Sequence, residues 1–166
     1  MATVAVRRAR PGDGRALARI HAEVAAYYVD LAPQHFRSPL LGGFEQELDA
    51  ELGVPRDAAL HLVAECEGEV VGALAARLLP PEDGAERQIA PDLGETRVRI
   101  DYVATAGAHR RHGVGTRLVQ AAEAWGREHG AAVAETWTYP PSPLSVPFWE
   151  QRMAYEKRSV NLRKRL

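Results

Sequence analysis

The sequence is poor in cysteine, in long apolar runs and in signals for export. Its single cysteine, Cys66, cannot form an internal disulfide, which is usual for proteins of a reducing compartment. The longest apolar run, residues 70–79, contains Arg77 and is about half of the roughly 20 residues that span a bilayer. Residues 1–13 lack the basic, apolar and small-residue order of an export signal. These absences predict a cytoplasmic protein that does not enter a membrane.

The sequence also lacks an excess of charge of either sign. Its 21 lysine and arginine residues and 22 acidic residues give a formal net charge of −1 at pH 7. Nucleic-acid-binding domains usually need a clear basic excess, because neutralised phosphates supply much of their affinity. We therefore expect no nucleic-acid partner. A length of 166 residues with 46% hydrophobic residues is typical of one globular domain, which we expect to cover residues 1–166.

The periodicity of apolar residues predicts a mixed α/β domain. In the first half, we expect a strand over 3–10, a helix with Asp13 as its N-cap, a helix over 44–52 and a hairpin over 61–79. A polar connection over 80–95 follows. In the second half, we expect a strand over 97–105, a helix over 114–130, a strand over 131–139, a short helix over 148–153 and a closing strand over 155–166. These elements would form one sheet flanked by helices.

The predicted strand over 97–105 has two faces that differ in chemistry. Strict alternation places on one face Val98, Ile100, Tyr102 and Ala104. It places on the other face Arg99, Asp101, Val103 and Thr105. We expect the second face to carry the chemistry.

The most specific feature of the sequence is segment 110–116, Arg-Arg-His-Gly-Val-Gly-Thr, between a predicted strand and a predicted helix. Its two glycines let the backbone turn N–H groups outward, and the helix that follows presents the positive end of its dipole. Arg110, Arg111 and Arg117 add positive charge. The segment predicts a site for a phosphate or pyrophosphate, and the alternative is a structural turn with solvated arginines.

Two nucleotide-binding patterns fit this segment poorly. A Walker A loop needs a lysine directly after its last glycine and four residues between its glycines, and the segment has neither. A dinucleotide-binding turn would use Glu135, but Leu118 stands at the third glycine position and only about thirty residues remain after Glu135. Nucleotide binding through this turn stays a third possibility.

The same segment carries a resemblance to a known family. Arg110, Gly113 and Gly115 match every fixed position of the pattern Arg/Gln-x-x-Gly-x-Gly/Ala of the GNAT acyltransferase superfamily, which the sequence resembles along nearly its whole length. A later segment, 142–155, matches the family more loosely. The resemblance implies an α/β fold with a mixed, mostly antiparallel central sheet flanked by helices, and acetyl-CoA or another acyl-CoA as co-substrate.

The resemblance also implies which residues hold the acyl-CoA. Backbone amides of 110–116 would hold its pyrophosphate, and the preceding strand would splay from its neighbour so that pantetheine pairs with exposed backbone. Ser142 and Ser145 stand at the positions of the family's Asn and Ala. The candidate cofactor-binding residues are Val103, Thr105, Arg110, Arg111, His112, Gly113, Val114, Gly115, Thr116, Ser142 and Ser145.

Two candidates for the chemistry lie on the predicted strand over 97–105. By the resemblance, the backbone N–H of Val103 would polarise the thioester carbonyl. Asp101 would act as a general base, standing where some members of the family place a catalytic histidine. Arg99 is two residues away and would stabilise the ionised carboxylate, so an Arg99–Asp101 salt bridge is the alternative.

The general acid is the weaker part of the match. The family often places a tyrosine where this sequence has Trp149, and an indole does not give up a proton usefully. Tyr139 and Tyr155 are the candidates in its place. We expect no metal site, because His109 and His112 have no further ligands at a suitable spacing.

These features predict an acyl-CoA-dependent N-acyltransferase, most simply an acetyltransferase. The acceptor would be a small-molecule amine or a protein N-terminus, and the acidic helix over 44–52 either borders it or is a solvated face. The alternative is a non-catalytic acyl-CoA-binding or sensory module, favoured by Trp149 and by the Arg99 neighbour of Asp101. The predicted closing strand offers a free edge for a possible homodimer.

Overall fold

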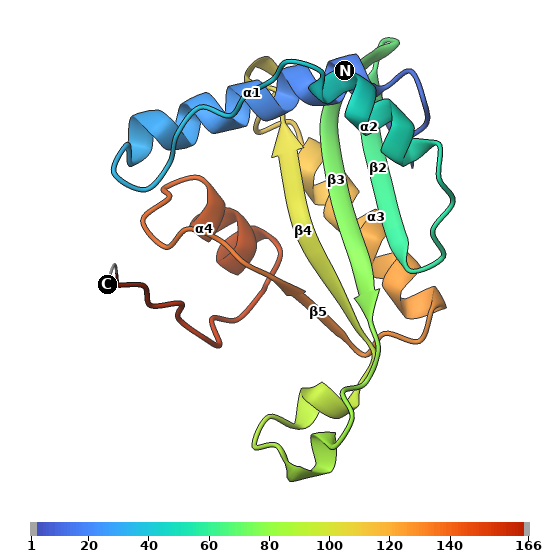
Figure 1. The fold of residues 1–166 in the computed structure, drawn as a ribbon, viewed down its shortest axis with the longest axis vertical. Helices are drawn as coiled ribbons and strands as arrows, with labels where there is room; N and C mark the ends of the chain where they lie inside the picture. Colours follow the sequence, from blue (N-terminus) through green and yellow to red (C-terminus); the bar gives the residue numbers. More distant parts are fainter. Residues whose placement is uncertain (1–2, 165–166) are drawn as a thin grey trace.

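The computed structural model describes residues 3–164 and contains one five-stranded sheet in the order β1-β2-β3-β4-β5 (Figure 1). Its strands are β1 (Val4–Arg8), β2 (Ala59–Cys66), β3 (Glu69–Leu79), β4 (Arg97–Thr105) and β5 (Val133–Thr136). Neighbours pair antiparallel, except that β5 pairs parallel to β4. The helices are α1 (Gly14–Leu31), α2 (Phe44–Leu52), α3 (Val114–Glu128) and α4 (Ser145–Pro147). The predicted fold class, a mixed and mostly antiparallel sheet with flanking helices, is confirmed.

The sheet separates two apolar clusters. The α3 side buries Val98 and Ile100 of β4 against the apolar stripe of α3, namely Val114, Leu118, Val119, Ala122 and Trp125. The α1 side buries Ile20 against Val63 and Ala104. Helix α3 lies close to β4 because Gly126 has no side chain: a Cβ there would stand 2.7 Å from Cγ1 of Val98.

The start of α1 is capped differently from the prediction. Asp13 stands at the N-cap, but its carboxylate accepts hydrogen bonds from the Arg7 guanidinium at 2.8 and 2.9 Å and from the Arg10 backbone N–H at 2.9 Å. The free N–H groups of Gly12 and Gly14 donate instead to Asp49 of α2, each at 2.8 Å. Asp49 therefore ties the acidic helix to the start of α1.

A bulge at Asp101 overturns the predicted alternation of β4. Ala75 of β3 pairs with Tyr102 and Ala76 pairs with Ile100, so Asp101 has no partner across this ladder. One extra residue reverses the direction of every side chain that follows it. Val103 consequently packs in the α3-side cluster, while Tyr102 turns to the α1 side. Asp101 and Val103 do not share a regular strand face.

Strands β4 and β5 part beyond a short paired segment. Their pairing runs from Arg97↔Val133 to Ile100↔Thr136, and β4 then continues to Thr105. Figure 1 shows β5 diverging from β4, with α4 on the side toward which β5 turns. A π-helical turn over Phe148–Arg152 continues α4. The predicted splay of these strands is present.

Two of the predicted strands differ from the structure. β5 is four residues long and not nine, and residues 155–164 form no strand, so the expected closing strand is absent from the part of it that the structure describes. Residues 165–166 of that prediction lie outside the described residues. Val160 and Leu162 are exposed, which leaves this segment without the buried face that a half-buried strand needs. The edge proposed for a homodimer is therefore not formed by the described part of this segment. Within residues 3–164, no helix is long and apolar enough to span a membrane.

Candidate active site

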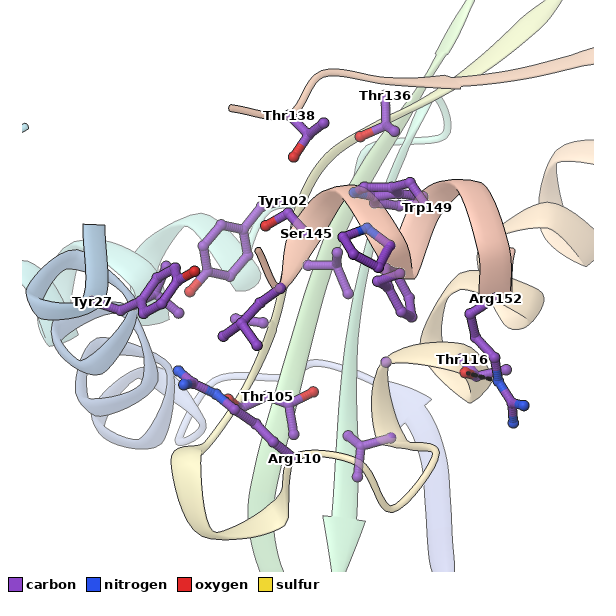
Figure 2. Close-up of a pocket in the computed structure, with 18 of the residues that line it drawn as sticks. Tyr27, Tyr102, Thr105, Arg110, Thr116, Thr136, Thr138, Ser145, Trp149 and Arg152 are labelled. Atoms are coloured by element: carbon purple, nitrogen blue, oxygen red, sulfur yellow. Dashed lines mark hydrogen bonds between the residues drawn. The ribbon is translucent and has the colours of Figure 1, made fainter. Parts of the chain in front are cut away.

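A cleft of about 700 Å³ opens where β4 and β5 part (Figure 2). Its walls come from β4, from α1, from the turn before α3 and from α4 with its π-helical continuation. The predicted site residues that line it are Asp101, Val103, Thr105, Arg110, Arg111, Gly113, Val114, Gly115, Thr116 and Ser145. Residues more than forty positions apart in the sequence, such as Asp101 and Ser145, therefore line one cavity.

The glycine turn has the backbone shape of an anion site. Arg111 and Gly113 adopt positive φ angles of 64° and 80°, and Gly113 is the N-cap of α3. The backbone N–H groups that follow, from Val114 to Thr116, belong to the first turn of the helix and have no intrahelical acceptor. A Cβ on Gly113 would meet nothing within 4 Å, so this position opens on free space. Free N–H groups and the helix dipole together favour a phosphate here.

The second glycine of the turn permits a close contact across the cleft. A Cβ on Gly115 would stand 3.4 Å from the Phe148 ring and 3.7 Å from Oγ1 of Thr105. Phe148 begins the π-helical turn, and such turns are frequent at functional sites. Glycine at 115 therefore keeps the floor of the cleft open between β4 and α4.

The arginines around the turn are arranged differently from the prediction. Arg110 turns toward α1, donating to the Thr105 carbonyl at 3.3 Å and stacking 5.6 Å over the Tyr27 ring. Arg117 does not line the cleft and donates to the carbonyl of Val4 at 3.4 Å.

A cation that the sequence did not reveal takes the place of Arg117. Arg152 lines the cleft and donates to Oγ1 of Thr116 at 3.4 Å, as Figure 2 shows. Thr116 and Arg152 are 36 residues apart, and only the return of α4 to the start of α3 brings them together. Arg110, Arg111 and Arg152 line the cleft, and Arg152 contacts the first turn of α3.

The ion pairs of β4 also differ from the Arg99–Asp101 salt bridge that was the alternative to a base role for Asp101. Arg99 donates to Oε1 of Glu135 at 2.6 Å. Asp101 instead pairs with Arg77 of β3, with Oδ2 3.1 Å from Nε and Oδ1 3.2 Å from Nη2. Asp101 stands at the bulge of β4, where it has no partner in the β3–β4 ladder. Asp101 still lines the cleft.

The two tyrosines expected as general acids are not among the residues that line the cleft. Tyr139 packs edge-on against Phe36, with ring centroids 5.0 Å apart. The Tyr155 hydroxyl donates to Oε1 of Glu123 on α3 at 3.2 Å, and burial raises the pKa of this phenol well above its usual value. The structure brings neither hydroxyl to the cleft.

Two predicted cofactor-binding residues also lie outside the lining. Ser142 is 2% exposed, and its Oγ contacts the Tyr27 hydroxyl and Oγ of Ser145, both at 3.1 Å, while accepting the Ser145 backbone N–H at 3.1 Å. It therefore holds the start of α4 against α1. His112 is part of the turn but does not line the cleft.

Tyr102 is a polar residue of the cleft that sequence reasoning placed among the core side chains. Its hydroxyl is buried and has no hydrogen-bond partner among the described residues, and burial raises its pKa well above the usual value. Figure 2 shows its ring on the same side of the cleft as Tyr27 of α1. Tyr102 thus lines the cleft while its hydroxyl oxygen is itself buried, and a buried hydroxyl without a hydrogen-bond partner costs stability.

A comparison with known protein families gives a match over most of the chain. Residues 23–155 match the model of the acetyltransferase (GNAT) family. The chain belongs to the GNAT acetyltransferase family. The resemblance predicted from Arg110, Gly113 and Gly115 is confirmed. A comparison with curated proteins gives no match.

Solved structures share the GNAT fold at low sequence identity. A mutant protein from Bacillus halodurans has a TM-score of 0.83 and 18% identity, with 98% of this chain and 99% of that chain covered. An acetyltransferase from Trypanosoma brucei has a TM-score of 0.68 and 17% identity, with 99% and 100% covered. An aminoglycoside N-acetyltransferase in complex with CoA has a TM-score of 0.66 and 17% identity, with 100% and 97% covered. These likenesses extend over whole chains and concern the fold.

Proposed function

We propose that this GNAT protein transfers the acetyl group of acetyl-CoA to a primary amine by direct attack on the thioester. The observation that carries the proposal is the junction of two features in one cleft: the parting of β4 from β5 and the glycine turn at the start of α3. The parting of the strands exposes the backbone of β4 to an extended ligand, and the glycine turn offers free N–H groups to a diphosphate.

The residues of the cleft fit an acyl-CoA along its length. The pyrophosphate would lie on the N–H groups of Val114 to Thr116, beside Arg111 and Arg152. The pantetheine would run along the part of β4 that β5 leaves unpaired, near Val103 and Thr105.

The chemistry divides between the co-substrate and the chain. The acyl-CoA supplies a thioester whose carbonyl carbon accepts the amine lone pair, so that a C–N bond forms, the C–S bond breaks and the proton lost by nitrogen ends on sulfur. Asp101 accepts that proton from the amine directly or through water. The Val103 backbone N–H polarises the carbonyl oxygen. Alignment of the two reactants by the cleft supplies much of the acceleration, since effective molarities reach about 10⁵–10⁸ M.

The general-acid role has no tyrosine in the expected place. Trp149 is 6% exposed, belongs to the α3-side core and also lines the cleft, where it serves as an apolar wall. Among the lining residues, Tyr102 has a buried hydroxyl whose pKa is raised by burial, so it is a poor proton source. A thiolate is a good leaving group, so acetyl transfer does not require a dedicated general acid.

A non-catalytic acyl-CoA-binding module remains the second candidate. The observation that favours it is the two-point pairing of Arg77 with Asp101, which occupies both carboxylate oxygens of the candidate base. Calorimetric titration with CoA and a thiol-release assay with acetyl-CoA and a panel of amines separate the two functions. Catalysis predicts binding and amine-dependent release, whereas binding without release with every amine would leave the binding module.

A further inference from the structure

A second cavity lies next to the cleft and shares two of its walls. It measures about 260 Å³ and is lined by Arg77, Arg99, Ile100, Asp101 and Trp137. Asp101 and Trp137 line both cavities, so a ligand in the second cavity stands beside the candidate base. The second cavity lies at the start of β4, where β5 is still paired, and α1 packs against the other end of the strand.

The second cavity has arginine side chains that are paired with neighbouring carboxylates and still keep free guanidinium N–H donors. Arg77 and Arg99 contribute two guanidinium groups, and Asp101 contributes one carboxylate. Arg77 uses Nε and Nη2 toward Asp101, and Arg99 uses Nε and Nη2 toward Glu135, which is not a lining residue. Each guanidinium has five N–H donors in a planar fork, so both keep Nη1 donors for a ligand. These remaining charged donors form strong hydrogen bonds with a carboxylate.

An aromatic surface adjoins these charges. Trp137 follows β5 and is 70% exposed, although its ring is large and apolar. Cζ of Arg99 lies 5.4 Å from the ring centroid, which orients the guanidinium and leaves the rest of the indole open. Trp137 thus offers a packing surface to an apolar group of a ligand.

We propose that the acceptor is an amino acid bound as a zwitterion in the second cavity: its amine faces Asp101, its carboxylate faces Arg77 and Arg99, and its apolar side chain packs on Trp137. This proposal rests on the proposed acetyltransferase function. The amine and carboxylate of an amino acid are one carbon apart, which matches the contact between Asp101 and Arg77. The product is an N-acetyl amino acid, with CoA released as the thiol.

The same walls disfavour a polycationic acceptor such as a polyamine or an aminoglycoside. Among the residues described as lining the two cavities, Asp101 is the one acid, and it is paired with Arg77. The acidic residues of α2 do not line either cavity, and Asp49 is occupied by the N–H groups of Gly12 and Gly14. The second cavity is also smaller than the roughly 300–1,000 Å³ of pockets for drug-sized ligands.

The test compares acceptors that differ in one group. Initial rates of CoA thiol release are measured with phenylalanine, with phenylalaninamide, which replaces the carboxylate by a neutral amide, and with spermidine and kanamycin. We expect kcat/KM for phenylalanine to exceed that for the amide by about 10- to 100-fold, the contribution of hydrogen bonds to a charged group. This comparison uses the unaltered protein, so its outcome does not depend on the folding of a variant.

Variants then assign the preference to the cavity. Arg99→Gln should raise KM for phenylalanine about tenfold or more and leave KM for the amide within about twofold, because only the acid uses the guanidinium. The control is Arg87→Gln, since Arg87 lies outside both cavities with an 86% exposed side chain, and both acceptors should behave as with the unaltered protein. Thermal melting of each variant reports that it is folded.

The outcomes distinguish the acceptor from the function. Equal kcat/KM for acid and amide, or thiol release with spermidine or kanamycin and not with phenylalanine, overturns the amino-acid proposal while acetyl transfer stands. Bound CoA with no release for any amine overturns the acetyltransferase function and the acceptor with it. An acid preference that Arg99→Gln does not reduce also overturns the proposed cavity.

Discussion

Replacement of Gly113 by alanine separates the cost of backbone strain from the loss of a phosphate site. Gly113 has φ 80° and Gly84 has φ 73°, and a Cβ on either would meet nothing within 4 Å. The two glycines therefore impose the same penalty on alanine, about 1–2 kcal/mol for a left-handed conformation. They differ in position, because Gly113 is the N-cap of α3 in the cleft and Gly84 precedes a short helical turn outside it.

The expected loss of affinity follows from the hydrogen bonds at stake. A methyl group at 113 would project into the open space that we propose for the diphosphate. Displacing one hydrogen bond to a charged phosphate costs about 1.5–3 kcal/mol, which corresponds to a CoA Kd that is about 10- to 150-fold weaker. Gly84→Ala should leave that Kd unchanged. Each variant should melt about 2–8 °C lower than the unaltered protein, since 1 kcal/mol is worth about 2–4 °C at this size.

Isothermal titration calorimetry with CoA and thermal melting measure the two effects independently. A third variant, Gly113→Asn, tests bulk without strain, because asparagine tolerates the left-handed region better than alanine. It should melt above Gly113→Ala and still bind CoA poorly. If Gly113→Ala and Gly84→Ala bind CoA equally well, the glycine turn is not the diphosphate site and this account of the cleft fails.

Three further perturbations test the chemistry and the stability of the fold. Asp101→Asn should lower kcat by about 10²–10⁴-fold with no change in acetyl-CoA affinity, and a pH–rate profile identical to that of the unaltered protein would reject the base role. Tyr102→Phe removes a buried hydroxyl that has no partner among the described residues, so it should raise the unfolding free energy by about 1–3 kcal/mol, and a lower melting temperature would contradict this. Hydrogen bonding to Arg7 lowers the pKa of Asp13, so its stabilisation is complete above the unfolded pKa of about 3.9 and is lost as the pH falls through the lower folded value. Asp13→Asn should therefore cost about 2 kcal/mol at pH 7 and less below pH 3 in chemical denaturation, and an equal cost at both pH values would refute the assigned pair.

Local features of the fold could be predicted from the sequence. The glycine turn, the start of α3 and its apolar stripe depend on neighbours within a few residues, so periodicity and glycine positions were sufficient. The bulge at Asp101 could not be predicted in this way. It depends on how β4 aligns with Ala75 and Ala76 of β3. The alternation of side chains along one strand carries no information about that alignment with its neighbour.

The residues of the cleft that were missed share a second cause. Arg152 and Tyr102 reach the cleft through tertiary packing, and an arginine side chain is long enough to reach several partners, so spacing along the chain does not select one. For the same reason, Arg99 was the salt-bridge alternative considered for Asp101, which pairs instead with Arg77 across the sheet. The strand predicted over 155–166 was inferred from the sequence of that segment alone, and its described residues pair with no neighbouring strand.

The central claim is that the cleft performs acetyl transfer to an amine. Its most direct measurement is the rate of CoA thiol release from acetyl-CoA by the purified protein, with and without an amine acceptor, followed by mass spectrometry of the acceptor. The account predicts amine-dependent release with a gain of one acetyl group on nitrogen, and loss of that release in Gly113→Asn. Tight CoA binding with no acetylated product from any amine would contradict it.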